Sequence, residues 1–106
     1  MSYKIGQLRK IIEQDYYSYD DSNNGYTITN NPENIITELS NNYSISSLSR
    51  FGIQAKPGSL IAIGDNNDVE IIMIGRSGIY EIYTDLVEVS NIQLLSQGSY
   101  IIDFKY

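Results

Sequence analysis

Residues 60–74 have the sequence LIAIGDNNDVEIIMI, in which two continuous apolar runs flank a polar cluster. The apolar runs, residues 60–63 and 69–74, have the length of strands and are rich in Ile, which favours β-structure. The cluster between them, residues 64–68, consists of Gly, Asp and Asn, the residues that tight turns prefer. The stretch therefore predicts a hairpin of two buried β-strands.

The same pattern of apolar segments and turns continues on both sides of this hairpin. Upstream, most apolar residues of segment 43–55 share one parity, and Lys-Pro-Gly at 56–58 matches a type II turn. Downstream, Gly-Arg-Ser-Gly at 75–78 predicts another turn, followed by strands over residues 79–84, 86–95 and 99–106. Short, evenly spaced strands predict an all-β fold, a small antiparallel β-sandwich or an open barrel.

The predicted core lies in the two strands with the highest apolar density, residues 69–74 and 99–106. Because these strands also carry few charges, we expect four of their side chains to be buried. They are Ile72, Ile74, Ile102 and Phe104.

The first 42 residues give a weaker pattern. Apolar residues recur at helical spacing around residues 6–14, which predicts a short amphipathic helix, although a strand could also begin there. Residues 26–29 predict a strand, whereas residues 33–40 fit either a helix or an edge strand. We therefore expect one domain over residues 1–106, with a helical or irregular N-terminal segment (1–42), interpreted as an attachment arm, before a β core (43–106).

Composition disfavours several functional classes. The chain of 106 residues has no Cys and no His, so thiolate and imidazole chemistry and most transition-metal sites are absent. Its net charge of −6 disfavours nucleic acid and anionic membranes as partners. The start lacks the apolar stretch of a signal peptide, and no apolar run approaches the length that spans a bilayer. We expect a soluble protein that is no enzyme and needs no cofactor.

One string resembles the opening of a calcium loop: Asp20, Ser22 and Asn24 alternate as oxygen donors and Gly25 follows them. The twelfth position of the loop is Asn31, where a bidentate Glu is needed. We therefore predict a turn that leads into the next strand, and no metal site.

Carboxylates also occur in the predicted strands, where a pair of them could in principle hydrolyse a glycosidic bond. Each alternates with apolar neighbours, so a solvated sheet face is the simpler interpretation. These residues are Glu70, Glu81, Glu88 and Asp103.

Ten tyrosines are the most distinctive feature of the composition. Tyr16, Tyr17 and Tyr19 precede a turn-rich segment, so we predict that they are exposed and bind a partner, either a protein or a sugar. The tyrosines at strand positions fit core packing or cross-strand pairing instead. They are Tyr80, Tyr83, Tyr100 and Tyr106.

Three segments carry a resemblance to known proteins: FGIQAKPG at 51–58, IMIGRSGIYE at 72–81 and YIIDFKY at 100–106. This half of the chain resembles a group of small uncharacterised proteins from phages and prophages of Firmicutes. These share a GIQ-x-x-PG turn, an IG-x-[ST]-GIYE hairpin and a closing IIDxxY strand. The resemblance supplies no catalytic residue.

The resemblance implies a virion component, such as a tail, baseplate or capsid accessory protein, that is assembled in the bacterial cytoplasm. Its expected partners are other virion proteins and copies of itself. The alternative is a small carbohydrate-binding or host-adhesion module that uses the N-terminal tyrosines.

Overall fold

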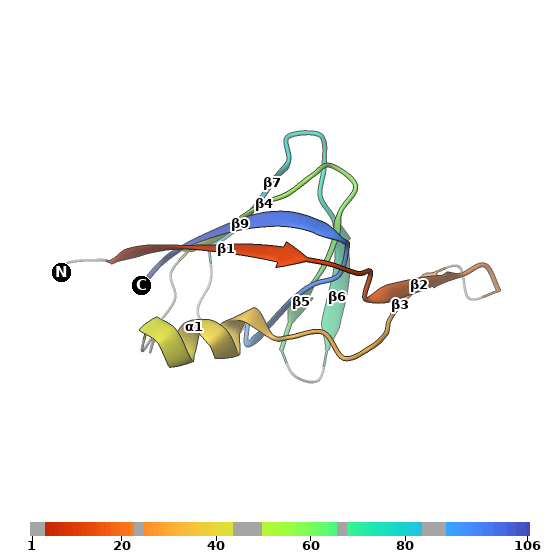
Figure 1. Ribbon diagram of the computed structural model, residues 1–106, viewed down its shortest axis with the longest axis horizontal. Helices are drawn as coiled ribbons and strands as arrows, with labels where there is room; N and C mark the ends of the chain where they lie inside the picture. Colours follow the sequence, from red (N-terminus) through yellow and green to blue (C-terminus); the bar gives the residue numbers. More distant parts are fainter. Residues whose placement is uncertain (1–3, 23–24, 44–49, 66–67, 84–88) are drawn as a thin grey trace.

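The computed structural model describes residues 4–22, 25–43, 50–65, 68–83 and 89–106. Within these residues the chain forms nine strands and one helix (Figure 1). In chain order they are β1 (Ile5–Ile12), β2 (Tyr17–Asp20), β3 (Gly25–Ile28), α1 (Ile35–Tyr43), β4 (Arg50–Gln54), β5 (Leu60–Gly64), β6 (Val69–Met73), β7 (Ile79–Ile82), β8 (Asn91–Leu94) and β9 (Gly98–Lys105).

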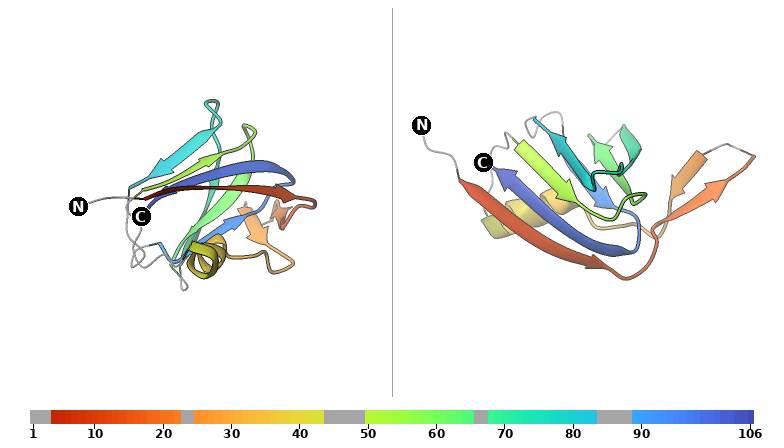
Figure 2. Two further views of the ribbon diagram at one scale, coloured as in Figure 1. Left: turned by 60° about the vertical axis from the view of Figure 1, so that its left-hand side comes forward. Right: turned by 90° about the horizontal axis from the view of Figure 1, so that it is seen from above.

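The strands form a four-stranded sheet in the order β1-β9-β4-β7, a three-stranded sheet in the order β6-β5-β8, and the separate hairpin β2-β3. All strand pairs are antiparallel. The predicted all-β class is therefore confirmed. The two larger sheets contribute to one shared core, an arrangement compatible with a sandwich (Figure 2).

The core draws on both larger sheets and on α1. Strand β9 alternates regularly, so that Tyr100, Ile102 and Phe104 are buried while their neighbours are at least partly exposed. The main cluster also contains Ile35, Ile36 and Leu39 of α1, so the core begins before residue 43. Three of the four predicted core residues, Ile74, Ile102 and Phe104, are confirmed as buried.

Strand β5 is apolar at successive positions because both of its faces are covered. Ile61 and Ile63 join the main cluster, whereas Leu60 and Ala62 form a second cluster with Leu95. The second strand of the predicted buried hairpin, β6, is different. Among the described strands it pairs with β5 alone, at the edge of its sheet. Ile72 is half-buried, so the prediction of its burial was wrong.

The first 43 residues differ from the prediction at three places and settle one open alternative. The strand β2 was not predicted, and Tyr43, which the sequence placed in the β core, is the last residue of α1. The expected helix at 6–14 is the strand β1, which pairs along its full length with β9. The open alternative at residues 33–40 is settled as the helix α1. Asn34 caps α1 by accepting a hydrogen bond from the backbone N–H of Ile36, and also from that of Ile92 in β8. The segment predicted as a strand over 86–95 contains the shorter strand β8 (Asn91–Leu94), and residues 84–88 lie outside the described residues.

Candidate functional site: surfaces for a binding partner

The hairpin β2-β3 projects from the end of the body opposite the chain termini (Figure 1). Its register places Tyr19 opposite Tyr26 and Tyr17 opposite Ile28, so these four side chains share one face. The tyrosine rings meet edge to face: the centroids of Tyr17 and Tyr26 are 5.6 Å apart, and those of Tyr19 and Tyr26 are 5.0 Å apart. We call Tyr17, Tyr19, Tyr26 and Ile28 the aromatic face of the hairpin.

The base of the hairpin is fixed to the body. The backbone N–H of Tyr16 donates to the carbonyl of Leu95 (2.7 Å), and that of Thr29 donates to the carbonyl of Tyr16 (2.9 Å). The side chains of Tyr16, Tyr17 and Ile28 pack against the second apolar cluster. The hairpin is thereby held at its base, while its outer half extends into solvent.

The predicted tyrosine site is therefore divided. Tyr16 and Tyr17 are half-buried supports, so the expectation that they are exposed was wrong, whereas Tyr19 is 54% exposed. Tyr26, which sequence reasoning did not include, is 38% exposed beside Tyr19. The available signal was the hairpin itself: a turn centred between residues 20 and 25 places position 19 opposite position 26. The exposed pair Tyr19 and Tyr26 is the stronger candidate for partner contact.

The turn of this hairpin contains the calcium-like string, and its described part is a local hydrogen-bonded turn. Oδ1 of Asp20 accepts hydrogen bonds from the backbone N–H and the hydroxyl of Ser22, at 3.0 and 2.7 Å. Asn24 lies outside the described residues. Over the described parts of the chain, no group of three or more His, Cys, Asp or Glu side chains is placed to hold a metal ion.

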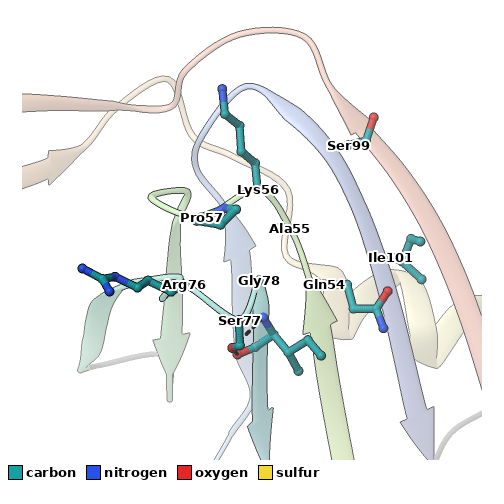
Figure 3. A pocket seen from close by; sticks show the side chains of 10 residues that line it. Gln54, Ala55, Lys56, Pro57, Arg76, Ser77, Gly78, Ser99 and Ile101 are labelled. Carbon is teal, nitrogen blue, oxygen red and sulfur yellow. Dashed lines mark hydrogen bonds between the residues drawn. The ribbon is translucent and has the colours of Figure 1, made fainter.

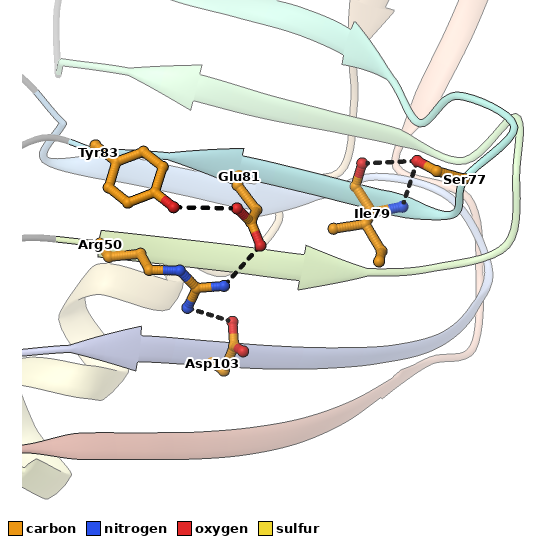
Figure 4. Close-up of polar contacts among 6 residues, drawn as sticks. All are labelled: Arg50, Ser77, Ile79, Glu81, Tyr83 and Asp103. Atoms are coloured by element: carbon orange, nitrogen blue, oxygen red, sulfur yellow. Dashed lines mark hydrogen bonds and ion pairs between the residues drawn. The ribbon is translucent and has the colours of Figure 1, made fainter.

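The outer face of the four-stranded sheet carries a small charge network (Figure 4). The guanidinium of Arg50 lies 2.8 Å from Oε1 of Glu81 and 3.2 Å from Oδ1 of Asp103, and the phenol of Tyr83 donates to Glu81 (3.4 Å). The hydrogen bond to Glu81 raises the pKa of Arg50. Both carboxylates are partly exposed and share one cation, as expected for a solvated sheet face.

Gly52 makes this network possible. It lies between Asp103 and Glu81 in the sheet register, and a Cβ at this position would overlap with Oδ1 of Asp103. Tyr83 at the end of the network is 75% exposed, so the expected core or pairing role for this tyrosine was wrong. The other three strand tyrosines, Tyr80, Tyr100 and Tyr106, pack in or against the main cluster as expected.

A hollow of about 620 Å³ lies between the turns at 56–58 and 75–78 (Figure 3). Both predicted turns are confirmed: the N–H of Ser59 donates to the carbonyl of Lys56, and that of Gly78 donates to the carbonyl of Gly75. The hollow is shallow, and Figure 3 shows the side chains of Lys56 and Arg76 extending away from it. None of the described residues that line it is acidic.

Comparison with known proteins adds no relative: no family model, curated protein or solved structure matches this chain. Among the described residues, no helix is long and apolar enough to cross a membrane.

Proposed function

We propose that this chain is a structural component of a bacteriophage or phage-like particle, a tail, baseplate or capsid accessory protein that acts through protein–protein contacts. In this proposal it is assembled in the bacterial cytoplasm and is retained in the virion in many copies. It acts without a catalytic step, and its partners are other virion proteins and copies of itself. The resemblance of residues 51–58, 72–81 and 100–106 to phage proteins suggests this setting.

The observation that carries the proposal is the aromatic face of the projecting hairpin. Two-stranded hairpins are marginally stable by themselves, yet this one extends beyond the body with Tyr19 and Tyr26 exposed. Tyrosines are enriched where one protein binds another, because a rigid ring buries a large area at a small cost in entropy. A neighbouring subunit that covers this face would bury both rings and complete the packing of the hairpin.

The test is incorporation of a Tyr19→Ser/Tyr26→Ser variant into particles. Central tyrosines of an interface often contribute about 2 kcal/mol or more, so we expect affinity for the particle to fall roughly tenfold or more. The matched control is Ser18→Ala/Thr27→Ala, a cross-strand pair on the opposite face of the same hairpin. Both variants should keep the native melting temperature within a few degrees, because neither changes a buried side chain. Native protein that is absent from purified particles, or full incorporation of the tyrosine variant, would refute the proposal.

A carbohydrate-binding or adhesion module is the second candidate, because the rings of Tyr19 and Tyr26 are exposed side by side and could stack on a sugar. A glycan array with the native protein and the same tyrosine variant separates the two functions. Binding of a glycan that the variant loses, together with unchanged incorporation, favours adhesion.

A further inference from the structure

Strand β1 forms one edge of the four-stranded sheet, and only β9 pairs with it among the described residues. Figure 2 shows β1 at the outer margin of the molecule with no described element beyond it. The strand is eight residues long and contains no proline. An edge of this length presents unpaired backbone groups that can pair with another strand.

The register identifies which backbone groups face outward. Lys4 and Tyr106 exchange two hydrogen bonds, N–H of each to the carbonyl of the other, at 2.7 and 2.8 Å. Because such pairs alternate in an antiparallel ladder, the even-numbered residues of β1 bond to β9. The outward backbone groups therefore belong to Ile5, Gln7, Arg9 and Ile11. One of them, the Gln7 carbonyl, already accepts a long hydrogen bond of 3.4 Å from the phenol of Tyr43 and keeps a second lone pair.

We propose that β1 pairs antiparallel with β1 of a second copy of this chain, about a twofold axis at Leu8. This register places Ile5 opposite Ile11 of the second copy and Gln7 opposite Arg9 of the second copy. All four outward-facing residues then form hydrogen-bonded pairs, and the two four-stranded sheets become one continuous sheet. The inference rests on the proposed function, because it specifies how copies of the protein contact each other.

The side chains of β1 favour this register over its neighbours. Ile5 and Ile11 are 80% and 74% exposed, the most exposed large aliphatic side chains of the described chain, and here they cover each other. A register centred on Arg9 would place two guanidinium groups opposite each other. A register centred on Gln7 pairs only three of the four outward residues within β1.

Lysines on an edge strand commonly prevent it from pairing with another chain, but the basic residues of β1 are not placed to do so. Lys10 lies on the inner face, where its ammonium is 2.9 Å from Glu38 and 3.3 Å from Glu33. Arg9 lies on the outer face, opposite the neutral Gln7 of the second copy. A hollow of about 200 Å³, lined in part by Arg9 and Ile11, lies next to the position that Ile5 of the second copy would take.

Charge variants at Gln7 test the register by sedimentation of the purified protein over a range of concentrations. Gln7→Glu creates two ion pairs with Arg9 across the axis and should lower the dissociation constant roughly two- to thirtyfold. Gln7→Arg should raise it by a similar factor, and Gln7→Arg/Arg9→Glu should restore association. Within one copy residue 7 lies opposite Asp103, so Gln7→Arg does not weaken the monomer, and its effect cannot be attributed to unfolding.

Disulfide formation gives a second readout, because the chain has no cysteine of its own. Opposite residues of a hydrogen-bonded pair have Cα atoms about 5.5 Å apart, within the range of a disulfide. A mixture of Gln7→Cys and Arg9→Cys proteins should therefore form the mixed dimer on oxidation. Gln7→Cys alone should not, because its two cysteines are diagonal neighbours about 7–8 Å apart.

A native protein that stays monomeric at the highest soluble concentration overturns the proposed pairing, as does equal cross-linking of the single variant and the mixture. These measurements need no particle. If they fail while the Tyr19/Tyr26 variant still loses incorporation, the proposed function stands without the β1 contact. If they succeed while the native protein is absent from particles, the dimer stands and the virion role does not.

Discussion

Replacing Gly6 by Ala should destabilise the protein, although glycine is ordinarily a weak residue in a strand. Gly6 lies directly opposite Phe104 of β9, and the ring of Phe104 covers it. An added Cβ would overlap with Cζ and Cε2 of the ring and lie 3.1 Å from Cε1. The ring is fully buried and held edge to face by Tyr43, with centroids 5.1 Å apart, and beside Tyr106 at 5.6 Å.

The magnitude follows from two opposing effects. Adding a methyl group to a packed site costs about 1–3 kcal/mol, because the ring or the strand must move. Alanine restricts the unfolded chain more than glycine does, which returns about 0.4–1 kcal/mol. We expect a net loss of about 1–2 kcal/mol in the free energy of unfolding. The assay is urea unfolding, with the melting temperature as a second measure.

Gly75→Ala is the matched control, because no atom lies within 4 Å of a Cβ at that position and its φ is not positive. This variant should be as stable as the native protein or more stable by up to about 1 kcal/mol. Phe104→Leu should make room for the methyl group, so Gly6→Ala/Phe104→Leu should cost less than the sum of its parts. Equal stability of Gly6→Ala and Gly75→Ala, or an additive double variant, would refute the packing explanation.

Three further predictions concern the core and the titratable groups. Ile74→Ala should cost about 2–5 kcal/mol in urea unfolding, because Ile74 is 2% exposed; an unchanged midpoint would contradict its core role. Lys10→Met should cost about 1–3 kcal/mol in the same assay, since it leaves the largely buried carboxylate of Glu38 without its cation; equal stability would show that the pair contributes nothing. Burial raises the pKa of Tyr100 above its unfolded value of about 10. The contribution of the neutral Tyr100 to the free energy of unfolding should therefore be fully present below about pH 10 and be lost as pH rises through the folded pKa. Tyr100→Phe loses the hydrogen bond to the Ser96 carbonyl, about 1 kcal/mol at pH 8, and should flatten that alkaline decline, which unfolding between pH 8 and 11 measures.

Sequence reasoning succeeded for two kinds of element: turns formed by residues that are close in the chain, and strands whose apolar residues recur at every second position. The turns at 56–58 and 75–78 have glycines with φ of 90° and 71° at Gly58 and Gly78, where other residues are strained. Strand β9 alternates without interruption, so its buried face was predictable. These features depend on local conformation and periodicity, which a sequence displays directly.

The errors arose where long-range pairing decides the outcome. Leu8 and Ile12 share a face in a helix and also in a strand, and pairing with β9, about ninety residues away, selects the strand. Ile72 belongs to an apolar run that resembles a central strand, yet its position at the sheet edge leaves one side open. For the candidate site, the sequence indicated a cluster of tyrosines before a turn, but it predicted neither their hairpin with β3 nor the division between supporting and exposed rings. That division depends on packing against Leu60, Ala62 and Leu95.

The distribution of burial along the chain links the two proposed contacts. Among the described residues before Pro32, no side chain is fully buried, although this segment forms β1, β2 and β3. Four of the eight large apolar side chains that are exposed in the described chain lie in this segment: Ile5, Ile11, Tyr19 and Tyr26. The buried residues of the main cluster all lie after residue 31, and Leu8 and Ile12 of the first segment pack against them as partly buried side chains. β1 is paired along its whole length with β9, so its exposed apolar side chains lie on an ordered strand of the sheet. In the two proposed contacts these side chains and the exposed tyrosines would be buried by a neighbouring copy or partner.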